Sequence, residues 1–107
     1  MLAIPKQFKA FRIQQEPAGE TKTVIGKFEQ LTIDDLTAGE VIIKVAYSGV
    51  NYKDALAATG KGKILRKYPL VGGIDLSGVV VSSSNVGFIS GDKVLVCGGQ
   101  LSEFYDG

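Results

Sequence analysis

The sequence contains no histidine and only one cysteine, Cys97, among its 107 residues. Without histidine, a Ser-His or Cys-His nucleophile pair, an imidazole proton shuttle and a histidine-ligated metal site are all excluded. A single cysteine can form no intramolecular disulfide, and it cannot supply the several thiolates of a structural zinc site. Any chemistry that the chain performs must therefore use other side chains.

The charges are nearly balanced. The sequence has 12 lysine and arginine residues and 11 aspartate and glutamate residues, which gives a formal net charge of +1. Nucleic acid and anionic lipid are recognised through a basic surplus on one face. No segment reaches the roughly 18 consecutive apolar residues of a membrane span, and residues 1–6 are too short and interrupted for a signal peptide. We therefore expect no nucleic acid partner and no membrane partner. The lone cysteine adds the expectation of a cytoplasmic location.

Glycine makes up 14 of the 107 residues, roughly double its average usage in proteins, which indicates many turns and short strands. Apolar and β-branched patterns predict strands at residues 7–14, 23–31, 41–47, 79–81 and 93–97, with a turn at 16–19. The run at 41–47 is almost continuously apolar, so we expect it to be a central strand. Turns at intervals of roughly 8–12 residues favour a small barrel or two-sheet fold.

Two local signals refine this pattern. Gly26 lies inside the strand at 23–31, where a glycine indicates a bulge or a close approach of backbone. A short helix is predicted between residues 51 and 60, because Asn51 is a favourable N-cap and Asp54 complements the helix N-terminus. Alanine and leucine fill its interior, and Gly60 is a natural end.

Three separated motifs resemble one superfamily in order and spacing. They are Gly49-Val50-Asn51-Tyr52-Lys53-Asp54, Gly73-Ile74-Asp75-Leu76-Ser77-Gly78 and Gly91-Asp92-Lys93-Val94. Together they resemble the GroES-like catalytic domain of the medium-chain dehydrogenase/reductase superfamily. The similarity is greater to its zinc-free quinone oxidoreductase branch, and within that branch to the acrylyl-CoA reductase (YhdH/YhfP-like) family. The resemblance implies a mainly β fold, a GroES-like partly open barrel with a short helix. Residues 1–6 would be an N-terminal tail, and residues 7–107 the N-terminal portion of the catalytic domain.

The resemblance also implies that no zinc is bound. Asn51 stands where the zinc-dependent relatives carry a ligand cysteine, and Gly73-Ile74-Asp75 stands where they carry the ligand histidine of a Gly-His-Glu block. An amide and an aliphatic group cannot replace a thiolate and an imidazole as strong zinc ligands.

The glycine-rich turn of a Rossmann domain, which holds the nucleotide in this superfamily, is missing from the sequence. The nearest string, Gly60-Lys61-Gly62-Lys63, follows a helix and lacks the later glycine. We therefore expect the chain to be the first part of a longer, zinc-independent, homodimeric oxidoreductase. By resemblance, that parent uses NADPH to reduce an activated C=C bond in a small-molecule quinone or acrylyl-CoA-type substrate. The isolated chain is expected to be inactive.

Site residues follow from the same resemblance. It places Asn51, Tyr52 and Asp54 beside the nicotinamide ring of the cofactor. Tyr52 would be the catalytic residue, which either orients the nicotinamide or donates a hydrogen bond as charge develops during hydride transfer. The alternative interpretation is structural: Asn51 and Asp54 cap the helix, and Tyr52 packs under it.

Three basic residues, Lys61, Lys63 and Arg66, lie on one loop and are candidates for contact with phosphates of NADPH or a coenzyme A ester. The alternative is a solvated loop. Asp75 is a candidate substrate contact near the site, or else a residue of a purely structural turn. Cys97 is expected to be a small buried side chain on its strand, without a redox function.

Two other functions compete with the reductase. The string at residues 72–78 is similar to the mobile loop of co-chaperonins, but Asp75 would bring a charge into that apolar contact. That loop also lies near the co-chaperonin N-terminus, whereas here it lies two-thirds along the chain. The second alternative is a truncated, non-catalytic GroES-like module for binding or oligomerisation.

Overall fold

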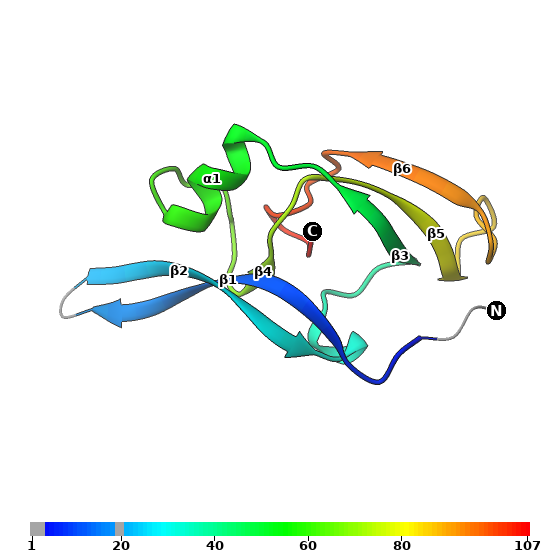
Figure 1. Ribbon diagram of the computed structural model, residues 1–107, viewed down its shortest axis with the longest axis horizontal. Coiled ribbons are helices and arrows are strands. Elements are labelled where there is room, and N and C mark those ends of the chain that lie inside the picture. The colour runs from blue at the N-terminus through cyan, green and yellow to red at the C-terminus, as the bar shows by residue number, and fades with distance from the viewer. Residues whose placement is uncertain (1–3, 19–20) are drawn as a thin grey trace.

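Two three-stranded antiparallel sheets and one α-helix form the fold in the computed structural model, which describes residues 4–18 and 21–107 (Figure 1). The first sheet has the order β2-β1-β4, and the second has the order β3-β5-β6. The strands are β1 (Phe8–Ala18), β2 (Thr21–Leu31), β3 (Val41–Ser48), β4 (Leu70–Val71), β5 (Asp75–Ser83) and β6 (Lys93–Cys97). A 3-10 turn, η1 (Ile33–Asp35), precedes β3, and the helix α1 (Tyr52–Thr59) follows it. The two sheets do not close on each other, which confirms the expected partly open barrel with a short helix.

The β1–β2 hairpin is longer than the sequence predicts. Its register runs without a shift from Phe8 opposite Leu31 to Ala18 opposite Thr21, so the turn expected at residues 16–19 is wrong for Glu16 to Ala18. Gly19, the last residue of that expected turn, lies outside the described residues. Pairing continues through Pro17 because β4 reaches only the Arg12 and Ile13 level of β1. Beyond that level β1 is an edge strand, where proline is tolerated.

Gly26 does not mark a bulge, and the group that approaches it closely is a side chain and not backbone. It lies in regular register, and a Cβ atom built on it would overlap the ring of Phe11 from the neighbouring strand. That ring also makes an edge-to-face contact with Phe28, with a centroid separation of 5.3 Å. Glycine at position 26 therefore makes room for an aromatic cluster on the hairpin.

The central strand of the second sheet is β5, and the expectation that the run at 41–47 is central is wrong. β3 lies at the sheet edge, and its residues from Lys44 onward are exposed. β5 alternates between partly exposed and buried side chains, with Leu76 and Val80 in the core. At Gly78 a side chain would collide with the carbonyl oxygen of Lys44, so β5 offers the flat backbone that close pairing with β3 requires.

The main core lies between α1 and the first sheet. Ile13, Ala57, Leu65 and Leu70 form its buried cluster, and each is at most 5% exposed. Two of these residues belong to the first sheet, one to the helix, and one to the loop that follows the helix. Burial of these apolar side chains provides the main force that holds the helix on the sheet.

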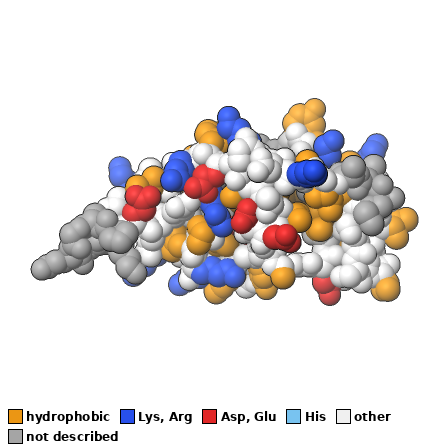
Figure 2. All heavy atoms as spheres, turned by 90° about the horizontal axis from the view of Figure 1, so that it is seen from below, with side chains coloured by type: hydrophobic (Ala, Val, Ile, Leu, Met, Phe, Trp, Pro, Cys, Tyr) orange, Lys and Arg blue, Asp and Glu red, His pale blue; other side chains and the backbone are white. Residues whose placement is uncertain are grey.

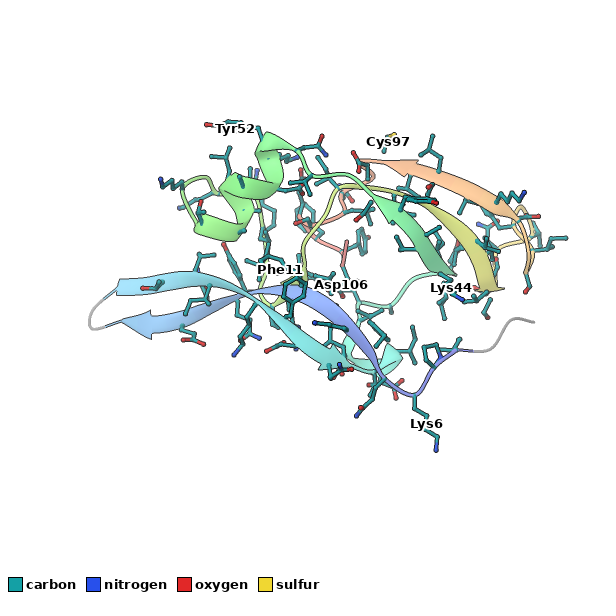
Figure 3. The ribbon with its side chains drawn as sticks, in the orientation of Figure 1. Lys6, Phe11, Lys44, Tyr52, Cys97 and Asp106 are labelled. Atoms are coloured by element: carbon teal, nitrogen blue, oxygen red, sulfur yellow. The ribbon has the colours of Figure 1, made fainter. Side chains whose placement is uncertain are left out.

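The last ten residues, which carry no periodic pattern, connect the two sheets. In Figures 1 and 3 this segment ends between the sheets, and Asp106 lies beneath α1 and β5. One Asp106 carboxylate oxygen accepts the N–H of Thr37 at 2.6 Å, and the other accepts the N–H of Val71 at 2.6 Å. In return, the Asp106 N–H donates to Thr37 Oγ1, and the Gly107 N–H donates to the Val71 carbonyl oxygen.

We expect Asp106→Asn to lower the free energy of unfolding by about 1–3 kcal/mol, because one of the two backbone donors would then face an NH₂ group. Asp34→Asn is the matched control, since Asp34 is an exposed aspartate on η1, and it should change stability by less than about 0.5 kcal/mol. Urea unfolding followed by circular dichroism measures both values. Equal stability of the two variants would contradict the connecting function of Asp106.

Candidate functional site

The corner between β3 and α1 is built from two of the three sequence motifs. Asp75, the first residue of β5, accepts the Gly49 N–H at 2.8 Å with one carboxylate oxygen and the Asn51 Nδ2–H at 2.9 Å with the other. A Cβ atom on Gly49 would lie 2.7 Å from the Asp75 carboxylate, so this contact requires glycine. Residues 26 and 24 positions apart in the sequence thus meet at one point.

The start of α1 follows the predicted capping pattern. The backbone N–H of Asn51 donates to the Asp54 carboxylate at 2.7 Å, and the Asp54 N–H donates to the Asn51 carbonyl oxygen at 3.0 Å. The helix ends at Gly60, whose φ of 73° is in the left-handed region that glycine favours. Asn51 and Asp54 therefore have a structural function at this corner, and cofactor contact by either residue stays a prediction.

Tyr52, unlike Asn51 and Asp54, takes no part in the capping of the helix. Its side chain is 80% exposed and points away from the sheets at the N-terminal end of α1 (Figure 3), so the interpretation that it packs under the helix is wrong. Tyr47 and Val50 on the approach to the corner are 78% and 91% exposed. The corner thus presents a phenol group and apolar surface to solvent.

An ion pair next to the corner was not predicted from the sequence. Lys53 Nζ contacts Glu103 Oε1, and the two side chains are only 41% and 28% exposed. The hydrogen bond from Lys53, then its charge and that of Arg66, hold the pKa of Glu103 below its ordinary value. The two residues are 50 positions apart in the sequence. No local pattern relates residues that far apart, so the pair could not be predicted from the sequence.

The basic loop is only partly brought to the corner. Lys61 and Lys63 are exposed after the end of α1, whereas Asn51 precedes its start, and a helix of eight residues is about 12 Å long. Arg66 lies closer to the corner, because its N–H donates to the Glu103 carbonyl oxygen at 2.7 Å. On the face seen in Figure 2, acidic and basic side chains are interspersed among apolar ones.

A shallow depression of about 300 Å³ opens on the outer face of the second sheet, beside the corner. Its lining includes Tyr47, Ser77, Leu95 and Cys97, together with Asp75. Cys97 is exposed there (Figure 3), so the expectation of a buried thiol is wrong. Alternate residues of β6 face opposite sides of the sheet, and positions 93, 95 and 97 are the exposed ones.

The electrostatics of the corner are set by Asp75. The Asn51 side chain and then the Gly49 N–H, both hydrogen-bonded to the carboxylate, hold the pKa of Asp75 below its ordinary value.

Over residues 4–18 and 21–107, no group of three or more Cys, Asp or Glu side chains is placed to hold a metal ion. In the same ranges, no helix has the length and apolar character that crossing a membrane requires.

The comparison with known families gives one match. Residues 37–105 match the alcohol dehydrogenase GroES-like domain family. Among curated proteins, 77 residues of the chain are 48% identical to YhfP of Bacillus subtilis, which carries the name of a quinone oxidoreductase. A second relative, acrylyl-CoA reductase AcuI of Ruegeria pomeroyi, is 42% identical over 94 residues. These regions cover 72% and 88% of the chain but only 23% and 28% of the two relatives.

Solved structures give the same picture. Escherichia coli YhdH with bound NADPH has a TM-score of 0.82 and 37% identity, over 92% of this chain and 29% of that protein. Bacillus subtilis YhfP with bound NAD has a TM-score of 0.78 and 40% identity, over 94% of this chain and 30% of that protein. The chain therefore spans about a quarter of the length of the curated relatives it matches.

The lowered carboxyl pKa values predict how stability depends on pH. A carboxyl group whose pKa is lower in the folded than in the unfolded chain stabilises the fold above its unfolded pKa, and this stabilisation is lost as the pH falls through its folded pKa. We expect the contribution of Asp75 and Glu103 to the free energy of unfolding to be fully present above about pH 5 and to be lost as the pH falls below about 4. Because Asp75→Asn removes one contributing group, the free energy of unfolding of this variant should fall less steeply with decreasing pH than that of the unmodified protein. Denaturant titrations at several pH values measure both slopes, and identical slopes would contradict the assignment.

Proposed function

Because the chain belongs to the alcohol dehydrogenase GroES-like domain family, we propose that it forms the N-terminal catalytic portion of an NADPH-dependent oxidoreductase. The proposed reaction is reduction of an activated C=C bond in a quinone or an acrylyl-CoA-type thioester, without zinc. Residues 7–107 would belong to the catalytic domain, and residues 1–6 to a tail. A homodimer and a cytoplasmic location complete the proposal.

The observation that supports this proposal most is the exposed phenol of Tyr52 at a corner held by three hydrogen-bonded side chains. The fold is shared with oxidoreductases whose structures contain bound NADPH or NAD. An exposed side chain on a firmly held corner suits a group that must meet a ligand in one fixed orientation.

The polar groups at the corner suit a nicotinamide cofactor better than they suit a metal ion. Asn51 offers an amide, Tyr52 a phenol and Asp54 a carboxylate shared with the helix cap, and these groups match the ring and carboxamide of nicotinamide. Asn51 and Ile74 at the positions of zinc ligands would not hold zinc. Bound NADPH would supply the hydride. Tyr52 would donate its O–H to the substrate carbonyl oxygen, where negative charge develops.

The binding of phosphate groups is the second part of the proposal. The basic residues of the loop that follows α1 are Lys61, Lys63 and Arg66, and their charges would contact phosphates of the cofactor or of coenzyme A. The second candidate function is a non-catalytic binding or oligomerisation module. It is favoured by the apolar side chains exposed on the open face of the second sheet, Tyr47 and Leu95, which are 78% and 73% exposed.

We expect the isolated 107-residue chain to bind NADPH weakly and to catalyse no NADPH oxidation. The physical reason is that both sheets are antiparallel over the described residues, whereas the dinucleotide site of the superfamily lies on a parallel sheet. Isothermal titration with NADPH and an absorbance assay with a quinone or acrylyl-CoA measure this. Turnover by the isolated chain would contradict the expectation.

In the full-length oxidoreductase, Tyr52→Phe should lower kcat by about 10- to 100-fold, because the transition state loses one hydrogen-bond donor. Tyr105→Phe is the matched control, since Tyr105 lies in the C-terminal segment, and its kcat should be unchanged. Both variants should keep the circular dichroism spectrum of the unmodified protein. If Tyr52→Phe keeps full kcat, the phenol has no catalytic function.

A further inference from the structure

We propose that Asp75 is a positioning residue that orients Tyr52 through Asn51. This inference rests on the proposed function for its catalytic consequence, but its structural part concerns only contacts within the described chain. The carboxylate of Asp75 does not contact Tyr52 itself. It contacts Asn51, the residue that immediately precedes Tyr52, and the backbone N–H of Gly49, three residues before Tyr52.

The first step of the argument is that the Asp75 side chain attaches the corner where strand pairing stops. The β3–β5 ladder ends with Ser48 opposite Leu76, the residue that follows Asp75 in the sequence. The ladder is also irregular between Val45 and Tyr47. Beyond Ser48, the Asp75 carboxylate takes over the attachment by accepting the Gly49 N–H at 2.8 Å. The backbone that leads to Tyr52 is therefore held by a side chain and not by a strand.

The second step is that Asn51 is held from two sides. Its backbone N–H donates to Asp54 at 2.7 Å, and its side-chain amide donates to Asp75 at 2.9 Å. The Asp54 contact stabilises the helix start, as in any capped helix. The Asp75 contact adds a connection from the helix start to the second sheet, which capping alone would not require.

The third step concerns Tyr52. Within residues 4–18 and 21–107, its hydroxyl has no hydrogen-bond partner and its ring makes no contact with another aromatic ring. Its side chain is 80% exposed, so no surrounding core determines where the ring points. The direction of its Cα–Cβ bond is then set by the backbone that leads to it. Asp54 holds that backbone at the Asn51 N–H, and Asp75 holds it at the Gly49 N–H and through the Asn51 side-chain amide.

A purely structural function for Asp75 within β5 is less consistent with the contacts. Asp75 is already paired with Cys97 in the β5–β6 ladder, so its backbone is fixed without its carboxylate. Both carboxylate oxygens are directed to Gly49 and Asn51. Hydrogen bonds keep the pKa of Asp75 low, so the carboxylate stays charged and accepts both bonds over the physiological pH range.

The first test uses the 107-residue chain and needs no activity. Asp75→Asn leaves one amide NH₂ facing a donor, and Asn51→Ser removes the Nδ2 donor while it keeps an N-cap oxygen. Both variants should lower the ¹⁵N order parameters of residues 49–52. Asp35→Asn is the matched control, because Asp35 makes the same kind of contact at η1, accepting the Thr32 N–H at 2.7 Å. Unchanged order parameters at 49–52 in both corner variants would overturn the proposal.

The second test uses the full-length oxidoreductase and a double-mutant cycle. Asp75→Asn should lower kcat about tenfold in the unmodified protein but less than twofold in the Tyr52→Phe background, because its effect passes through the phenol. Equal losses in both backgrounds would overturn the positioning function. If the full-length protein reduces no quinone or acrylyl-CoA, the proposed function fails, and the order parameters of the isolated chain still decide whether Asp75 holds the corner.

Discussion

The bridge formed by Asp106 is the interaction on which the arrangement of the two sheets depends. The sheets share no strand, so hydrogen bonds of a ladder cannot hold one against the other. The Asp106 carboxylate instead accepts backbone N–H groups from β4 of the first sheet and from Thr37 in the segment that leads into β3. A charged acceptor with two backbone donors is stronger than a neutral contact and is sensitive to geometry. It joins β4 of the first sheet to the segment that precedes β3 of the second sheet.

The C-terminal segment that contains Asp106 also contacts the candidate site. The segment that carries Asp106 also carries Glu103, which pairs with Lys53 in the first turn of α1. The helix is thus held from below by the apolar core around Ile13 and Leu70, and at its start by Glu103, Asp54 and Asp75. Loops at strand ends on a firmly held framework are a usual place for binding groups. The exposed phenol of Tyr52 and the depression beside Asp75 lie at such strand ends.

Local signals in the sequence predicted the elements whose causes are local. The helix α1 lies between its N-cap Asn51 and its C-cap Gly60, as predicted, because capping and a left-handed glycine act over a few residues. The strand at 93–97 was likewise predicted with its observed bounds. Two expectations that depended on tertiary neighbours were wrong. The apolar run of β3 did not reveal that β5 would occupy the sheet centre, and the small size of Cys97 did not reveal which face of β6 would be covered.

By itself, the sequence determined the family, the mainly β class and the helical corner. The signals for these features, which are the motifs in their order, the turn residues and the helix caps, each depend on only a few consecutive residues. Only the tertiary structure decided that Asp75 would hold Asn51, that Glu103 would reach Lys53, and that Asp106 would connect the sheets. These pairs lie 24 to 69 residues apart. Their meeting is a result of sheet register and loop closure, which no local pattern of residues encodes.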